Sequence, residues 1–174
     1  MRLELAAMRW LWLGKGCHYI LEQRSPRWHL GAPDILGVTK CRHLIEIEIK
    51  RSVSDFKADD KKYYRRELYI NKMARQFYYL TPPEIVGKIK PLLPPWAGLM
   101  STNEAELVYV EQEAPVNKAA TRLTIKECVK LSRCMVNHLM SYVIALENNH
   151  QKFLRRDDQA FIELEDANAG TWQI

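Results

Sequence analysis

The sequence has 174 residues and a formal net charge of +5, a size that fits one domain with a substantial core and an added helical segment. The charge is uneven, because residues 1–80 hold 16 Lys and Arg against 9 Asp and Glu, whereas residues 81–174 hold 10 against 12. A basic amino-terminal half disfavours a neutral metabolite as the ligand, and it favours a polyanion such as nucleic acid.

Cysteine spacing and hydropathy indicate the compartment. The four cysteines, Cys17, Cys41, Cys128 and Cys134, form no Cys-x-x-Cys pair, which suits a reducing environment. Arg9 interrupts the short apolar run near the start, so we expect no signal peptide and a cytoplasmic location. Since no stretch reaches the ~20 apolar residues of a membrane span, we expect no membrane partner.

The first 50 residues predict one helix and three strands. Residues 2–14 are apolar nearly all round and indicate a mostly buried helix that ends near Gly14 and Gly16. Strands are expected after it at 17–23, 35–39 and 44–50. Alternation in the last strand places three charged side chains on one face and isoleucines on the other, the charged residues being Glu46, Glu48 and Lys50.

Charges on so apolar a strand need counter-charges. The isoleucines favour a buried central strand, where a carboxylate requires a cation. Asp34 follows Pro33, and with Glu48 it could hold a divalent metal beside Lys50, which is the apparatus for cutting a phosphodiester. The alternative is a solvated strand face whose charges pair across the sheet, with Pro33 and Asp34 in a turn.

The Pro33-Asp34 pair followed by Glu48-Ile49-Lys50 resembles the PD-(D/E)xK nuclease superfamily, which has the restriction-endonuclease-like fold. The strings at 50–56, 76–84 and 96–100 are similar to MmcB-type DNA-repair nucleases and related phage proteins. The resemblance runs from Glu4 to about Pro115. It implies an α/β fold with a mixed sheet of about five strands flanked by helices, and a nuclease-like core over residues 1–115.

The same resemblance implies roles for individual residues. Asp34 and Glu48 would bind Mg²⁺ or Mn²⁺, the carbonyl of Ile49 would add a ligand, and Lys50 would activate or orient water. Glu4 would be a further acid from the first helix, although the first turn of any helix favours an acid. Supporting positions are given to Ser52 and to Glu46, which lies about 7 Å from Glu48 along the strand.

A basic helix is expected after this strand. Ser54 or Asp55 can cap it, and it would run to about Asn71. The cations of this region are candidates for contact with DNA phosphates: Arg51, Lys57, Lys61, Lys62, Arg65 and Arg66. The alternative is a solvated helix face whose cations are balanced by Asp59, Asp60 and Glu67.

The second half predicts a strand at 76–81, a short helix at 84–89 and a hairpin formed by 99–101 and 107–111. Residues 116–174 would form a C-terminal helical extension, with a long amphipathic helix from Thr124 to about Asn148. This helix either packs on the core or forms a homodimer contact, and both interpretations stay open.

These features predict a Mg²⁺-dependent DNA endonuclease acting in DNA repair, recombination or phage DNA processing, and RNA is not excluded as the substrate. One alternative is a non-catalytic nuclease-fold module that binds DNA and recruits a repair or replication partner. Another is a protein-interaction subunit that uses the long helix, which would leave the basic amino-terminal half unexplained.

Overall fold

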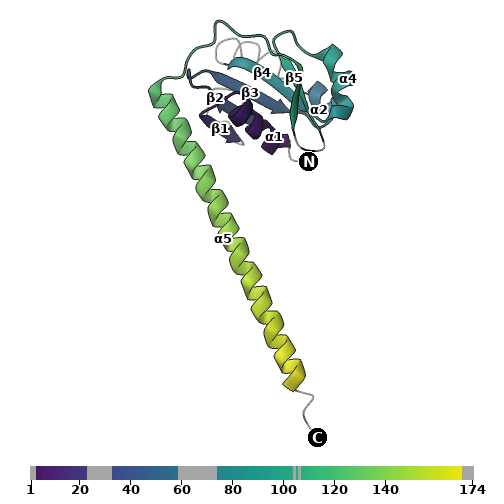
Figure 1. The fold of residues 1–174 in the computed structure, drawn as a ribbon, viewed down its shortest axis with the longest axis vertical. Helices are drawn as coiled ribbons and strands as arrows, with labels where there is room; N and C mark the ends of the chain where they lie inside the picture. Colours follow the sequence, from purple (N-terminus) through teal and green to yellow (C-terminus); the bar gives the residue numbers. More distant parts are fainter. Residues whose placement is uncertain (1–2, 23–32, 59–73, 104, 106, 170–174) are drawn as a thin grey trace. The chain divides into compact units, whose positions relative to one another are not determined.

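The structure, a computed structural model, describes residues 3–22, 33–58, 74–103, 105 and 107–169, with the backbone alone for 19–22 and 150–169. By their internal contacts the residues form two units, Met1–Ser132 and Arg133–Ile174. The first unit contains a mixed sheet of six strands in the order β1-β2-β3-β4-β5-β6 (Figure 1). No helix in the described part of the chain is long and apolar enough to cross a membrane.

The strands follow one another across the sheet in chain order. The first three are antiparallel, β4 and β5 run parallel to β3, and β6 returns antiparallel along β5. Their bounds are β1 Tyr19–Glu22, β2 Ile35–Val38, β3 Leu44–Ile49, β4 Ala74–Thr81, β5 Gly98–Thr102 and β6 Val108–Gln112. Every residue of β3 is buried, as expected for a central strand covered on both faces.

One face of the sheet is covered by α1 (Leu3–Arg9) and by the π-helical turn η1 (Trp10–Gly14) that continues it. The side chains of Leu3, Ala7 and Leu11 recur every four residues and pack in one cluster with the β3 isoleucines. The approach is close at Gly37 in β2, where an added Cβ would lie 2.8 Å from the Leu11 Cδ2 atom. A larger residue at position 37 would therefore push this helical segment off the sheet.

The opposite face is covered by α2 (Val53–Ala58) and by the segment η2 (Pro83–Ile85), α4 (Val86–Ile89) and η3 (Lys90–Leu92). Phe56 and Ile89 from these helices pack against Phe77 and Tyr79 of β4. Because side chains alternate along β3, the residues it presents to this same face are Leu44, Glu46 and Glu48 rather than the isoleucines.

The long helix α5 covers Ile125–Ala169. Its first turn carries a capping box, since Thr124 Oγ1 accepts the Glu127 N–H at 3.2 Å and Glu127 Oε2 accepts the Thr124 N–H at 2.7 Å. Cys128 and Leu131, in the part of α5 that belongs to the first unit, are buried.

The predicted α/β architecture, with a mixed sheet flanked by helices and a long C-terminal helix, is confirmed. The sheet has six strands rather than about five because both arms of the expected hairpin join it, as β5 and β6. The last helix extends past Asn148 to Ala169, since the added sequence contains no Gly or Pro before Gly170. The helix expected at 54–71 is described only in its first part, as α2.

Candidate active site

Asp34 immediately precedes β2, and Glu48 lies in β3, the antiparallel neighbour of β2. The β2–β3 ladder ends with Ile35 paired to Ile47, and Asp34 and Glu48 are each one residue beyond that pair. The Asp34 carboxylate also accepts the Ile49 N–H, with Oδ2 at 2.7 Å from the nitrogen, and so takes the place of a β2 carbonyl at the end of the ladder.

Glu48 and Lys50 form a buried ion pair. The Lys50 Nζ atom donates to Glu48 Oε1 at 3.1 Å. Glu48 is only 5% exposed and Lys50 only 4%. Glu48 pairs with Tyr79 across the parallel β3–β4 ladder, so an aromatic strand flanks the carboxylate on its other side. Low surrounding polarity strengthens such a pair and penalises the loss of either partner.

Ile49 lies between the two charged residues and links them to Asp34. In a β-strand, the N–H and C=O of one residue point toward the same neighbouring strand. Because the Ile49 N–H is directed at Asp34, the Ile49 carbonyl also points to the Asp34 side of β3. Two carboxylates and one carbonyl, all hard oxygen donors, therefore belong to residues at one end of β3.

Glu4 of α1 reaches the same end of β3 through Arg51. The Arg51 Nη2 atom donates to Glu4 Oε1 at 2.7 Å, in a pair whose side chains are 57% and 34% exposed, respectively. Glu4 also lies in the first turn of its helix, where an acid is favoured in any case. The ion pair joins α1 to the chain immediately after Lys50, and it engages the two residues predicted as a further acid and a DNA contact.

The predicted supporting residues have distinct positions. Glu46 is buried on the same face as Glu48, with Phe77 beside it in β4. Ser52 caps α2, since its Oγ accepts the Asp55 N–H at 3.0 Å and its carbonyl accepts the Phe56 N–H. The cap is thus two to three residues earlier than the Ser54 or Asp55 expected, because Ser52 is the residue placed to bind the first free amides.

Of the cations predicted to contact DNA along the basic helix, Lys57 is described and is exposed on α2. Four others lie outside the described residues: Lys61, Lys62, Arg65 and Arg66. Their proposed role stays a prediction.

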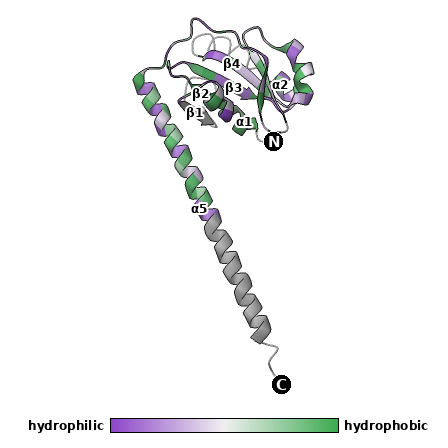
Figure 2. Ribbon diagram, in the orientation of Figure 1, coloured by the Kyte–Doolittle hydropathy of each residue, from purple (hydrophilic) through white to green (hydrophobic). Residues whose placement is uncertain are grey.

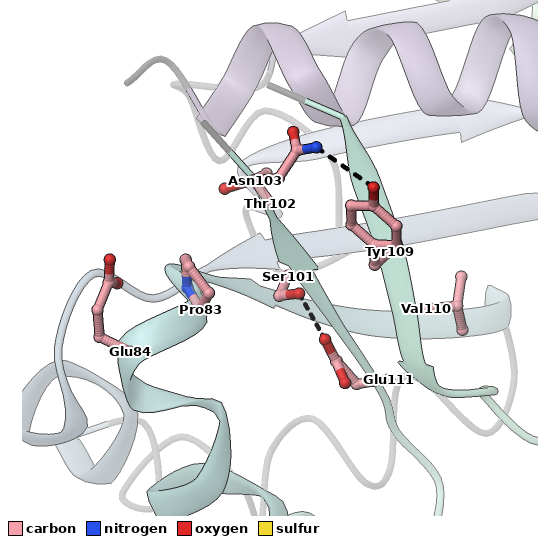
Figure 3. A pocket seen from close by; sticks show the side chains of 8 residues that line it. All are labelled: Pro83, Glu84, Ser101, Thr102, Asn103, Tyr109, Val110 and Glu111. Carbon is pink, nitrogen blue, oxygen red and sulfur yellow. Dashed lines mark hydrogen bonds between the residues drawn. The ribbon is translucent and has the colours of Figure 1, made fainter. Parts of the chain in front are cut away.

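A second group of polar residues lies at the carboxyl ends of the parallel strands. Thr81 ends β4, and Ser101 and Thr102 end β5, all three buried. Ser101 donates to Glu111 of β6 at 2.6 Å, and the two side chains point toward one another in a cavity of about 490 Å³ (Figure 3). Since β3 is parallel to these strands, Glu48 and Ile49 end at the same edge of the sheet.

Sequence reasoning missed Ser101, Thr102 and Glu111. A signal was present, because Ser101 and Thr102 directly follow the apolar Leu99 and Met100, and ligand sites of parallel sheets lie at strand carboxyl ends.

The metal predicted from the resemblance would have three oxygen donors at one end of β3. Within the described residues, no group of three or more His, Cys, Asp or Glu side chains could hold an ion. Mg²⁺ is often bound by one or two carboxylates, with waters and substrate phosphates completing its shell. Asp34, Glu48 and the Ile49 carbonyl fit that kind of site.

Comparison with known proteins shows a likeness in fold. No family model matches the sequence, and no curated protein matches it. Among solved structures, the SPO1766 protein of unknown function from Silicibacter pomeroyi is similar, with a TM-score of 0.58 and 22% identity. The match covers 84% of this chain and 89% of that one. The shared architecture therefore extends over most of both proteins, and at this identity it concerns the fold alone.

Proposed function

We propose that this protein is a Mg²⁺-dependent DNA endonuclease of the PD-(D/E)xK type. The observation that carries the proposal is that the Asp34 carboxylate accepts the Ile49 N–H at 2.7 Å while Lys50 donates to Glu48 at 3.1 Å, so these residues lie at one end of β3. The order of elements supports it as well, because one helix, three antiparallel strands, a second helix and a strand parallel to the third follow each other in the chain.

Each residue has a role that follows from its chemistry. Asp34, Glu48 and the Ile49 carbonyl would hold the ion, which when bound supplies an activated water and neutralises charge on the phosphate. Lys50 would orient the attacking water or a phosphate oxygen, since its ammonium is fixed beside the Glu48 carboxylate. The Glu4–Arg51 ion pair would fix the end of β3 against α1.

The substrate class follows from charge. The amino-terminal half carries the acids of the site together with a net surplus of Lys and Arg, which attracts a polyanion in spite of those acids. DNA is the proposed substrate, and RNA is the alternative substrate to be tested beside it. The four free cysteines suit a reducing cytoplasm as the place of action.

The alternative is a DNA-binding module of the same fold that cuts nothing. It would bind phosphates through the basic segment and recruit a repair or replication partner. Carboxylates near a phosphate weaken binding unless a cation lies between them, so a binding-only protein gains no affinity from Asp34 and Glu48. We therefore favour the enzyme.

The deciding experiment is a cleavage panel. The protein is incubated with plasmid, forked and single-stranded DNA and with single-stranded RNA, in Mg²⁺, Mn²⁺ or EDTA. Asp34→Asn is the most informative variant, because an Asn oxygen can still accept the Ile49 N–H while the charge is lost.

We expect Asp34→Asn to lower the cleavage rate by roughly 100-fold or more while DNA binding in EDTA is retained. Glu147→Gln, which removes an exposed carboxylate on α5, is the matched control and should cleave like the wild type. Cleavage that survives EDTA, or an Asp34→Asn variant as active as the control, would contradict the proposal. Binding without any cleavage would favour the module.

We also propose that two copies of the chain associate through α5. Between Val129 and Leu146 the helix follows a heptad repeat with Val129, Val136 and Val143 at one core position. The other core position holds Ser132, Leu139 and Leu146. Valine at the first of these positions with leucine at the second favours a parallel two-stranded coiled coil.

Exposure supports this assignment. Val136, Leu139, Val143 and Leu146 are 51%, 60%, 46% and 69% exposed, respectively. Apolar residues recur along the first part of α5 in Figure 2. A row of exposed apolar side chains on a long helix is typical of an interaction surface, and the heptad spacing favours a second copy of the same helix as its partner.

A further inference from the structure

A cavity of about 330 Å³ lies at the opposite end of β3 from Glu48 and Lys50. Three cationic side chains line it, Lys15, Arg75 and Arg122, together with His43 and Cys41. His43 comes just before β3 and Arg75 is near the start of β4, so the cavity is at the amino ends of these parallel strands. From His43 to Glu48 is roughly 16 Å along the strand, which separates this cavity from the proposed active site.

His43 is held in place by its turn. The Thr39 N–H donates to the His43 carbonyl at 2.9 Å, and the His43 N–H donates to Thr39 Oγ1 at 3.1 Å. Arg42 adopts a positive φ of 63° in this turn, and its carbonyl accepts the Leu123 N–H at 2.8 Å. This hydrogen bond joins the segment that carries Arg122 to the turn that carries His43. Hydrogen bonds of the backbone therefore hold the residues that line the cavity in position.

The His43 imidazole faces a cation. An Arg75 Nη1 atom lies 3.4 Å from His43 Nε2, and because a guanidinium can only donate, Nε2 must accept. The proton of the neutral ring is therefore on Nδ1, which is buried and has no hydrogen-bond partner among the described residues. Burial lowers the pKa of His43, and the positive charges of Arg75 and Arg122 lower it further.

The positive charge of the cavity is incompletely balanced. Lys15 lies 3.9 Å from the exposed Glu113 carboxylate. Arg75 and Arg122, in the described part of the chain, have no carboxylate within ion-pairing distance. Two guanidiniums that have no carboxylate partner among the described residues leave a surplus of donors beside the cavity, and a tetrahedral oxyanion would supply acceptors for them.

We propose that this cavity binds a phosphate group, either free or on a nucleotide or strand end. Arg75 and Arg122 would donate to its oxygens, and Lys15 would add a third positive charge. The volume lies in the range of small-ligand sites, roughly 300–1,000 Å³. The proposal stands apart from the proposed nuclease activity, because it concerns other residues at the other end of the sheet.

Cys41 offers a direct readout, since it lines the cavity and is exposed, whereas Cys17 and Cys128 are buried. The full-length protein is alkylated with neutral iodoacetamide, with and without inorganic phosphate, at an ionic strength matched with chloride. Modification at Cys41 and at Cys134, the internal control on α5, is followed by peptide mass spectrometry.

We expect phosphate to slow alkylation of Cys41 but not of Cys134, by about tenfold at ten times the dissociation constant. Arg75→Gln with Arg122→Gln should abolish the protection, Arg75→Lys should retain part of it, and Lys90→Gln, at the other edge of the sheet, should leave it unchanged. Circular dichroism confirms that each variant is folded. Equal protection of both cysteines, or protection that survives the double substitution in folded protein, would overturn the proposal.

Further ligands in the same labelling experiment identify the source of the phosphate. Protection by inorganic phosphate and by a nucleoside monophosphate indicates a site for a free ligand. Protection by a 5′-phosphorylated oligonucleotide, but not by its 5′-hydroxyl counterpart or by the small ligands, indicates a strand end. Failure of every arm to protect Cys41 would exclude the site. Because labelling is measured and not cleavage, an inactive nuclease would leave this test unaffected.

Discussion

At the scale of single residues, the charged face of β3 shows what alternation in a sequence can and cannot predict. The spacing of Glu46, Glu48 and Lys50 predicts a shared face and a need for counter-charge, and in the structure Lys50 itself donates to Glu48. The contact of the Asp34 carboxylate with the Ile49 N–H could not be derived, because it depends on the register set by the turn between β2 and β3.

Removing one member of the buried pair should cost more than removing both. Lys50→Met leaves a buried carboxylate without its ammonium, so we expect the free energy of unfolding to fall by about 3–5 kcal/mol. The double variant Glu48→Gln with Lys50→Met should recover most of that loss, since neither buried group is then charged. Urea denaturation of Lys50→Met, of Glu48→Gln and of the double variant measures the coupling energy between the two residues. Additive effects would show that the pair makes no specific contribution.

At the scale of elements, the sequence predicts most of the residues at which helices begin and end. Gly14 and Gly16 end the first helix as expected, with Gly16 at a positive φ of 59°. The π-helical form of η1 was not predicted, and Leu11 in this turn lies close to Gly37 of β2. The cap of α2 at Ser52 was missed, since Ser52, Ser54 and Asp55 are all good capping residues and only geometry selects among them.

The cap of α5 gives a prediction about pH. Hydrogen bonds from the Thr124 side chain and backbone lower the pKa of Glu127, so the capping box stabilises the fold at neutral pH. Because the folded pKa is depressed, this contribution is lost as the pH falls through the acidic range of a glutamate. Thr124→Ala should cost about 1 kcal/mol at neutral pH, with Thr124→Ser as the conservative control.

Thermal unfolding of these variants, followed by circular dichroism across the acidic range, is the measurement. The difference between Thr124→Ala and the wild type should narrow as the pH falls. It should not vanish, because the Thr124 Oγ1 atom also accepts the Glu127 N–H, which does not titrate. A difference that stays constant with pH would show that the Glu127 carboxylate has no part in the cap.

At the scale of the whole molecule, the cavities at the two ends of the parallel strands are lined by charges of opposite sign. Glu48, Glu84 and Glu111 lie at the carboxyl ends of the parallel strands, whereas His43, Arg75 and Arg122 lie at the amino ends of β3 and β4 or beside them. Composition predicts a basic half and an acidic half of the chain, but not this separation, because strands from both halves contribute to each edge.

Association through α5 is also a property of the whole molecule, and the molecular mass of the protein in solution tests it. The chain has a mass of 20.4 kDa, and sedimentation equilibrium should give twice that value for the wild type. Leu139→Lys places a charge in the proposed seam and should weaken association by about 100-fold or more. Asn137→Lys adds the same charge to the outer face of the helix and should not.

The orientation of the two helices has its own test. In a parallel, in-register pair, the two copies of residue 136 face each other, so Val136→Cys should form an intermolecular disulfide on mild oxidation. Ser141→Cys, on the outer face, should not crosslink. A dimer that resists crosslinking at position 136 would have antiparallel helices, and a wild-type mass of one chain would rule out the α5 interface. Because the repeat places valine at every first core position from 129 to 143, we expect the parallel pair.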